Sequence, residues 1–459
     1  MKKRWIYPLF LALAMGLPAA CSDDENTPPG GPELPPAPVA TVQQAQQEID
    51  RVGKDFMNEI DTEELNSVYE LVADCAGMLG IDEDDEPYYP DWGYGVRAKA
   101  SAGFASLNKL FRAVATGDFS VAASSRAAEE IYRVSDYYGE WTWDERNEEW
   151  VKTADNASAA IYRFKHDGKA CVAQAKGSGN KFTLRHDIDG ELVTVEVPAE
   201  VTASLTEAGK TMVQIDVHTS KCSLDGKELA LTTEVQVANL KAVGQVDVSN
   251  KLAKANVRLT AGGKELLNAA CNVDGNNLAD VDAYESEYFD PAQDLKAGTA
   301  ACNIMGSMSL NLVADNKDGK LGAALDFDGY YWSSESFYEG LTTPVKYGEG
   351  DKNTAKRAAE NAADMLNQKA KAALYFANST YTVPVTFRAA ETYHYNYEEH
   401  DSYNPAYYYK SEGGEWSVEP LMTFEDGTTY TFEGYFDNTR FGSLVTMFND
   451  LVDKITGDK

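Results

Sequence analysis

The segment from residue 393 to residue 400 combines side chains that often do chemistry in proteins. His394, Glu398 and His400 alternate with tyrosines, so in a β-strand they would share one face. Imidazole and carboxylate groups bind metals. Every second position of a strand is roughly 6.6 Å from the last, however, so one metal cannot easily take three consecutive members of such a row. The pattern favours a polar face in solvent opposite an aromatic face directed inward.

Tyrosine is frequent, with 26 in 459 residues, and several gather near this segment. Exposed aromatic rings stack on sugar rings, but tyrosines buried in a large sheet would explain the same count. Both interpretations remain open from the sequence. If the rings are exposed, the candidate ligand-binding residues are Tyr393, Tyr395, Tyr397, Tyr407, Tyr409 and Trp416.

Two Asp-Gly segments partly match the spacing of a calcium-binding loop. The matching positions are Asp187, Asp189, Gly190 and Glu196 in one segment and Asp326, Asp328, Gly329 and Glu335 in the other. Arg185 and Ala324 occupy the first position, where a carboxylate should bind the ion. Both segments are therefore interpreted as turns, and no metal site is predicted.

The sequence contains no nucleophile elbow, phosphate-binding loop, dinucleotide fingerprint or zinc-protease motif. A pair of glycosidase carboxylates remains possible, because its two members need only meet in space. No catalytic residue or cofactor is assigned, and we expect a protein that is not an enzyme.

The chain from residue 136 onward has the period of two that is typical of β-strands. Asp-Gly and Gly-Gly pairs recur between the alternating runs, and both residue types tolerate the positive φ of a tight hairpin turn. These pairs predict antiparallel strands joined in sequence order. They begin at Asp167, Asp189, Asp225, Asp274, Asp318, Asp328, Asp426, Gly262 and Gly413.

Apolar residues at intervals of three and four predict helices before and within this region. The first two helices cover residues 42–60 and 61–79, and Asp61 with Glu64 forms a candidate capping box for the second. A third helix is expected at 96–114 and a short fourth at 127–134. Two more are expected near 353–371, where alanines give a small-residue face, and near 439–456.

Five cysteines follow residue 70, at widely spaced positions and without a CxxC pair, so neither a disulfide framework nor a zinc site is indicated. Cys271 and Cys302 occur in nearly repeated Ala-Ala-Cys-Asn segments. We interpret them as small core residues on equivalent strands and prefer this to a disulfide between them.

The first 25 residues carry targeting information. Lys2, Lys3 and Arg4 precede a short apolar run, which ends in small residues before Cys21. This ending resembles the lipobox of bacterial lipoproteins, and the acidic residues after it resemble the export signal of Bacteroidota surface lipoproteins. The resemblance implies that Cys21 receives a diacylglyceryl anchor and that the protein lies on the outer membrane, at the cell surface, with the periplasmic face as the alternative.

The formal net charge is −32, so an acidic surface should repel nucleic acid and anionic lipids. The membrane is therefore expected to be a partner through the anchor on Cys21 and not through basic residues. The proline-rich residues 22–40 are interpreted as an extended tether.

Together these patterns predict an α+β fold, in which a large, curved, mainly antiparallel sheet carries amphipathic helices on one face. The expected divisions are a signal peptide (1–20), a tether (21–40), a helical segment (41–135) and a β-rich body (136–459), with 41–459 forming one unit. In outline this is similar to half-barrel lipoproteins of the LolA and LppX type, although no motif is shared. We expect non-catalytic binding of a lipid-like or apolar ligand between sheet and helices. The alternatives are glycan or protein binding by exposed aromatics, and a structural envelope lipoprotein.

Overall fold

The alternating segments form strands and the amphipathic segments form helices in a computed structural model of the chain. The structure describes residues 37–79, 131–133, 135, 138–188, 191–224, 227–280, 289–337, 345–348, 350–379, 381–400, 408–436 and 438–456. Cys21, most of the tether and the helix expected at 96–114 lie outside these residues.

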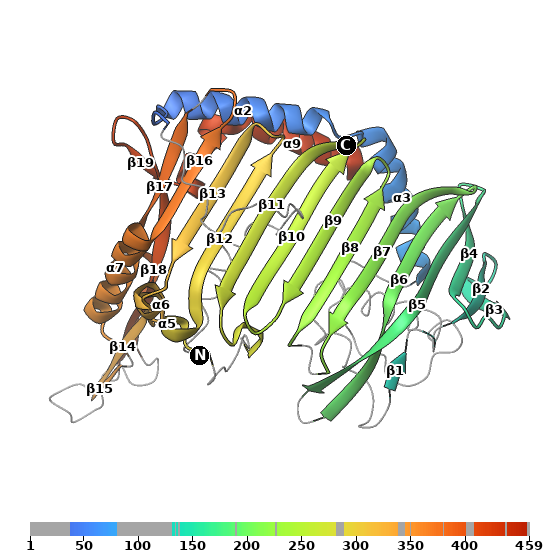
Figure 1. Ribbon diagram of the computed structural model, residues 1–459, viewed down its shortest axis with the longest axis horizontal. Coiled ribbons are helices and arrows are strands. Elements are labelled where there is room, and N and C mark those ends of the chain that lie inside the picture. The colour runs from blue at the N-terminus through green and yellow to red at the C-terminus, as the bar shows by residue number, and fades with distance from the viewer. Residues whose placement is uncertain are drawn as a thin grey trace.

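The described strands form one large curved sheet (Figure 1). They are β1 (Ile131–Arg133), β2 (Gly139–Asp144), β3 (Glu149–Ala154), β4 (Ala160–His166), β5 (Lys169–Ile188), β6 (Glu191–Glu207), β7 (Lys210–Cys222), β8 (Leu229–Val237), β9 (Leu240–Val248), β10 (Leu252–Ala261), β11 (Lys264–Gly275), β12 (Leu295–Ile304), β13 (Met308–Asp315), β14 (Tyr330–Phe337), β15 (Val345–Gly348), β16 (Ala370–Phe376), β17 (Thr382–His400), β18 (Tyr408–Thr423) and β19 (Thr429–Thr431).

The described helices lie along one edge of the sheet and near its β14 end (Figure 1). They are α2 (Val42–Asn58), α3 (Thr62–Leu79), α5 (Pro291–Asp294), α6 (Lys320–Leu325), α7 (Lys352–Lys369), α8 (Phe432–Tyr435) and α9 (Asn438–Thr456), with a 3-10 turn at Leu278–Asp280. The prediction of an α+β fold built on a large, mainly antiparallel sheet is confirmed. No described helix is both long and apolar enough to cross a membrane.

Strands β4 to β13 are nearest neighbours in chain order and antiparallel, as hairpin turns require. Asp167 and Gly168 have φ values of 49° and 75°, and Gly262 and Gly263 have 55° and 86°, so both pairs form the expected tight turns. Four other predicted hairpin turns are wrong, because the pair at Asp274 ends β11, the pair at Gly413 lies inside β18, and the pairs at Asp318 and Asp328 lie on either side of α6. The pairs at Asp189 and Asp225 lie outside the described residues.

The registers place apolar and polar side chains on opposite faces of the sheet. One row crosses four adjacent strands and consists of Ala269, Cys302, Leu310 and Leu374. The row beside it points to the other face and consists of Asn268, Asn303, Ser309 and Tyr375. We call the apolar side the inner face and the polar side the outer face. Such one-sided burial is typical of antiparallel sheets.

Cys271 and Cys302 lie on neighbouring strands of the inner face, and no disulfide joins them. Cys271 is directly opposite Ala300, so Cys302 is its diagonal neighbour. Diagonal positions are about 7–8 Å apart, which is beyond the usual reach of a disulfide. The interpretation of both residues as small residues on equivalent strands is confirmed.

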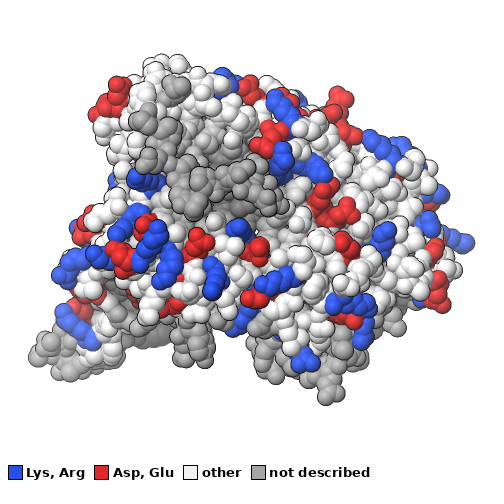
Figure 2. All heavy atoms as spheres, viewed as in Figure 1, with Lys and Arg blue, Asp and Glu red and all other residues white. Residues whose placement is uncertain are grey.

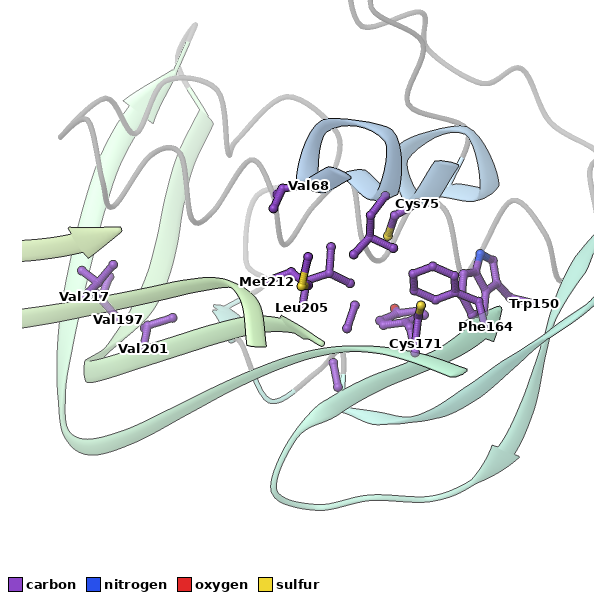
Figure 3. Packing of buried hydrophobic residues seen from close by; sticks show 14 of the residues in the cluster. Val68, Cys75, Trp150, Phe164, Cys171, Val197, Val201, Leu205, Met212 and Val217 are labelled. Atoms are coloured by element: carbon purple, nitrogen blue, oxygen red, sulfur yellow. The ribbon is translucent and has the colours of Figure 1, made fainter. Parts of the chain in front are cut away.

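Several helices pack on the inner face, among them α3. Val68 and Cys75 of α3 contact a core that includes Phe164 of β4 and Leu205 of β6 (Figure 3). Trp150 is fully buried in this core, and its indole nitrogen donates to the carbonyl oxygen of Met78 at 3.1 Å. Burial raises the pKa of the Cys75 thiol to about 12, so this group is uncharged in the core.

Helices α7 and α2 cover the inner face toward the other end of the sheet. Ala362 and Leu366 of α7 pack on strands β13, β16, β17 and β18, and Ile49 of α2 packs near Leu374 and Val383. The buried face of α7 is rich in alanine, as predicted. Its first turn is capped by Asp351, whose carboxylate accepts from the backbone N–H of Thr354 at 2.9 Å.

The first two helices are also tied to hairpin turns at one edge of the sheet. Lys264 Nζ lies 2.5 Å from Glu59 Oε1, and Lys210 Nζ lies 2.7 Å from Glu64 Oε1. The Asp61 carboxylate accepts from the backbone N–H groups of Glu63 and Glu64 at 3.1 Å, which confirms its half of the predicted capping box, whereas the Glu64 carboxylate pairs with Lys210. The last helix, α9, packs on both α2 and α3.

The short helix expected at 127–134 is wrong where the structure describes it. Ile131–Arg133 instead forms β1, which pairs in parallel with residues 194–196 of β6. Isoleucine and tyrosine are good strand formers, and backbone pairing with an existing strand outweighs a weak helical period in so short a segment.

Candidate ligand-binding face

Strands β17, β18, β14 and β15 extend the sheet in this order beyond the end of α7 (Figure 1). We call this extension the lobe: all of β14 and β15, residues 393–400 of β17 and residues 408–415 of β18. The lobe gathers aromatic residues that are far apart in the sequence.

The registers place these aromatic residues on the outer face. Tyr393, Glu415 and Tyr330 form one row across three strands. Tyr395, Gly413 and Trp332 form the next row, and Tyr397, Ser411, Ser334 and Tyr347 form the third. We call Tyr330, Trp332, Tyr347, Tyr393, Tyr395, Tyr397 and Tyr409 the aromatic face.

Four side chains of the aromatic face are well exposed. The exposed fraction is 55% for Tyr393, 46% for Tyr397, 43% for Tyr330 and 48% for Tyr347. The prediction that the tyrosines of residues 393–397 point inward is therefore wrong. Tyrosines on the inner face would need a helix to cover them, but α7 does not extend over the lobe. Both faces of β17 are therefore exposed to solvent there.

The two glycines of β18 make room for tyrosine rings on opposite faces. A Cβ atom at Gly413 would lie 2.5 Å from the ring of Tyr395. A Cβ atom at Gly414 would lie 2.8 Å from the Tyr331 hydroxyl oxygen and 2.4 Å from the carbonyl oxygen of Tyr393. Glycine inside a strand is therefore explained here by close approach, and not by a turn.

Hydroxyl groups form a network beneath the exposed rings. Ser334 and Ser411 are each only 3% exposed, and both hydrogen-bond the hydroxyl of Tyr409, as does Tyr397. These bonds, above all that from Ser334, lower the pKa of Tyr409. The rings of Tyr397 and Tyr409 lie 5.7 Å apart, and those of Tyr393 and Tyr395 lie 5.9 Å apart. The aromatic face thus combines flat apolar surfaces with fixed hydroxyl groups.

A β-bulge at Thr392 sets the direction of these side chains. The pairing with β18 shifts between Glu391 and Tyr393, so Thr392 is an extra residue in β17. Glu391 and His394 therefore both point to the inner face, although they are three residues apart. The tyrosines after the bulge point outward.

On the inner face, Glu391 and His394 meet Tyr331. The hydroxyl of Tyr331 donates to Glu391, and His394 Nδ1 lies 3.1 Å from the same oxygen. Because the hydroxyl proton is directed to the carboxylate, the hydrogen bond from histidine requires a hydrogen on Nδ1. Burial and the bond to Glu391 raise the pKa of Tyr331.

Lys352 joins this group from the first turn of α7. Its Nζ lies 3.0 Å from Glu391 Oε1, 3.7 Å from Glu412 Oε1 and 5.3 Å from the centre of the Tyr331 ring. The bonds from Tyr331 and Lys352 lower the pKa of Glu391. This inner network connects α7 to the lobe and so holds the aromatic face in position.

The structure brings together four of the six predicted site residues. Tyr393, Tyr395, Tyr397 and Tyr409 belong to the aromatic face, while Tyr407 lies outside the described residues. Trp416 does not belong to it, because it faces inward opposite Glu391, half-buried, with Lys356 Nζ 5.4 Å from the centre of its ring. Tyr409 and Trp416 are seven positions apart on one strand, and an odd spacing places two residues on opposite faces.

Sequence reasoning missed the contribution of β14 and β15 to the site. Tyr330, Trp332 and Tyr347 lie on the aromatic face, but their strands pair with β18 only after a long excursion through α7 and β16. Tyr330 and Trp332 are two positions apart, and this spacing indicated that they share one face of a strand. Nothing in the sequence showed which strand they pair with.

A separate hollow of about 500 Å³ lies where the β12–β13 and β16–β17 turns meet the start of the described chain. Its lining includes Pro38, Met308, Tyr375 and Tyr381, and no helix residue. It is therefore not the cavity between helices and sheet that we expected. Among the described residues, no group of three His, Cys, Asp or Glu side chains is placed to hold a metal ion.

Comparison of the chain with protein-family models, curated proteins and solved structures finds no match. The site must therefore be interpreted from its own geometry.

Proposed function

We propose that this protein is a non-catalytic, lipid-anchored binding protein of the outer membrane that holds a glycan on its aromatic face. The observation that carries the proposal is the exposure of Tyr330, Tyr347, Tyr393 and Tyr397 on one face of a four-stranded lobe. Isolated exposed tyrosines need no explanation, but an ordered group on one face indicates an interaction site.

The chemistry of the face fits a sugar. The C–H side of a pyranose ring is apolar and stacks on a flat aromatic ring, while its hydroxyl groups need hydrogen-bond partners. The hydroxyls of exposed tyrosines such as Tyr393 and Tyr397 supply such partners, and the buried serines beneath them help to fix the rings. Because these residues stand on paired strands and close-packed glycines, little conformational entropy is lost when they bind.

The expected position of the protein supports the same function. The resemblance of residues 1–25 to a lipoprotein signal implies an anchor on Cys21, and the proline-rich tether would hold the folded body away from the lipid. A binding protein displayed in this way meets extracellular polysaccharides before they reach the membrane.

Binding of the full mature chain to a glycan array tests the proposal. We expect selective binding to one or a few glycans, and a loss of about tenfold or more in affinity in the double variant Tyr393→Ala/Tyr397→Ala. Tyr69→Ala is the matched control, because Tyr69 is 38% exposed on α3 and is not part of the face. Absence of any bound glycan, or equal binding by the double variant and the control, would overturn the proposal.

A second candidate function is binding of a lipid-like ligand on the inner face. It is favoured by the small side chains of the central strands, such as Gly244, Ala255, Cys271 and Ala300, which are only half-buried. Native mass spectrometry of the protein purified from its host, followed by organic extraction, tests this function. A stoichiometric lipid would support it, and a mass equal to that of the protein alone would exclude it.

A further inference from the structure

A carboxylate stands between two exposed rings of the aromatic face. Glu415 lies in the row between Tyr393 and Tyr330, directly opposite both in the registers of β17 and β14. Its side chain is half-buried, so a ligand resting on the two exposed rings would meet this group.

The surroundings of Glu415 are acidic. Burial raises its pKa, and the negative charge of Asp328, two residues before Tyr330, raises it further. At the other described positions of the lobe's outer face, tyrosine, tryptophan, serine, glycine and valine occur, with Glu399 in the row of Tyr409, and no lysine or arginine. Lys346, Lys352 and Lys410 are on the inner side of the lobe or on α7.

The nearest outward-facing cation along the described part of β17 is already paired. Arg388 lies in the row of Glu419, four residues along β18 from Glu415, and its guanidinium is 2.8 Å from the Glu419 carboxylate. It therefore does not offset the charge of Glu415. A carboxylate without a cationic neighbour accepts hydrogen bonds from hydroxyl groups and repels a second carboxylate.

Resting on the proposed glycan binding, we infer that the aromatic face selects uncharged glycans and rejects those that carry carboxylates, such as uronic or sialic acids. Tyr393 and Tyr330 supply the stacking surfaces for the sugar. Glu415 accepts hydrogen bonds from its hydroxyls and discriminates against an acidic ring.

The test compares neutral polysaccharides with their C6-carboxylated forms. Starch, mannan and galactan are each offered to the full mature chain beside the carboxylated polymer of the same linkage, with whichever glycans the array identified added to the set. We expect the neutral form of any bound polysaccharide to bind about tenfold more tightly than its carboxylated form. The variant Glu415→Gln, which keeps the size of the side chain, should bring the two affinities close together.

Two further measurements keep the outcomes distinct. The preference should shrink as salt rises from about 0.05 M to about 0.5 M, because salt screens a charge repulsion but not a difference in shape. The control Asp426→Asn, in the exposed turn before β19, should leave the preference unchanged.

Equal binding of neutral and carboxylated forms, with both lost in Tyr393→Ala/Tyr397→Ala, would overturn the inference and leave glycan binding intact. A preference unchanged in Glu415→Gln and in high salt would also overturn it, whereas binding of no glycan would overturn the proposed function itself.

Discussion

Gly413 and Gly414 determine how closely tyrosine rings approach β18. In Gly413→Ala the new methyl group meets the Tyr395 ring, which can rotate away, so we expect a loss of about 1–3 kcal/mol in unfolding free energy and weaker glycan binding. Gly414→Ala should cost more, because its methyl group meets the Tyr393 carbonyl of the neighbouring strand.

Urea unfolding of these variants beside Gly244→Ala checks the prediction. Gly244 is also inside a strand, but the nearest atom to an added Cβ would be 3.6 Å away, so this control should change stability by less than about 1 kcal/mol. Similar losses in all three variants would show that strand propensity, and not the close approach of the tyrosines, decides the effect.

The inner network makes part of the stability dependent on pH. The pKa of Glu391 is lowered in the folded protein, first by the Tyr331 hydroxyl and then by Lys352, so its ionised form stabilises the fold. This contribution is complete above the ordinary pKa of glutamate and is lost as the pH falls through the lowered value. We expect Tyr331→Phe to melt at a lower temperature than wild type at neutral pH. The difference between the two melting temperatures should become smaller in acid.

Melting curves between about pH 7 and about pH 3 measure this effect. Tyr69→Phe, on an exposed helix surface, is the control and should follow the wild type throughout. A constant difference between Tyr331→Phe and wild type over this range would contradict the role given to Glu391.

At the scale of elements, the bulge in β17 decides which face the tyrosines occupy. Deletion of Thr392 should remove the bulge and leave Tyr393, Tyr395 and Tyr397 on the outer face, because Tyr393 then directly follows the inward-facing Glu391 and side chains alternate along a strand. We expect the deletion variant to retain most of the glycan binding. The substitution Thr392→Ala keeps the residue count and should also retain most of the binding.

Loss of glycan binding in the deletion variant, with binding retained in Thr392→Ala, would contradict this assignment of faces. Protection of the tyrosines from iodination by bound glycan is the second measurement. The aromatic residues should be protected in wild type, in the deletion variant and in Thr392→Ala.

The sequence was sufficient for most single elements. Helices α2, α3, α7 and α9 follow from their apolar periods, and the turns at Asp167 and Gly262 follow from residues that tolerate positive φ. The bulge at Thr392 left no such mark, because the residues around it alternate regularly in type. Only the register with β18 shows that one residue is extra, and this register depends on tertiary contacts.

The candidate site was predicted in part for a related reason. Alternation in 393–397 correctly put three tyrosines on one face, but alternation alone does not show which face is covered. Coverage depends on where α7 ends relative to the sheet. The partners on β14 and β15 depend on strand order, which one sequence does not provide.

At the scale of the molecule, acidic and basic side chains share the same surface. Figure 2 shows them interspersed over the face in view, without one acidic patch. Pairs such as Lys165 with Glu145 and Arg258 with Glu265 are exposed, and each contributes little to stability. The net charge of −32 therefore acts mainly on solubility and on the choice of partners.

The anchor proposed for Cys21 gives a whole-molecule prediction. We expect the wild-type protein to incorporate radiolabelled palmitate and to fractionate with the outer membrane, and Cys21→Ser to do neither, because serine lacks the thiol to which the diacylglyceryl group would be attached. Cys222→Ser, at a half-buried position in β7, is the control and should be labelled as wild type is. Labelling of Cys21→Ser would place the lipid elsewhere.

The contact of α9 with α2 and α3 links the two ends of the described chain. Gln46 of α2 donates to the carbonyl oxygen of Arg440 at 2.8 Å, and Tyr435 donates to the carbonyl oxygen of Val42 at 3.0 Å. A chain is synthesised from its N-terminus, so the hairpins can pair one after another as they emerge, while α2 and α3 gain their contacts with α9 only later. Any product that stops before residue 438 leaves α2 and α3 without these contacts. Packing of the first two helices is therefore completed only after residues 438–456 have been synthesised.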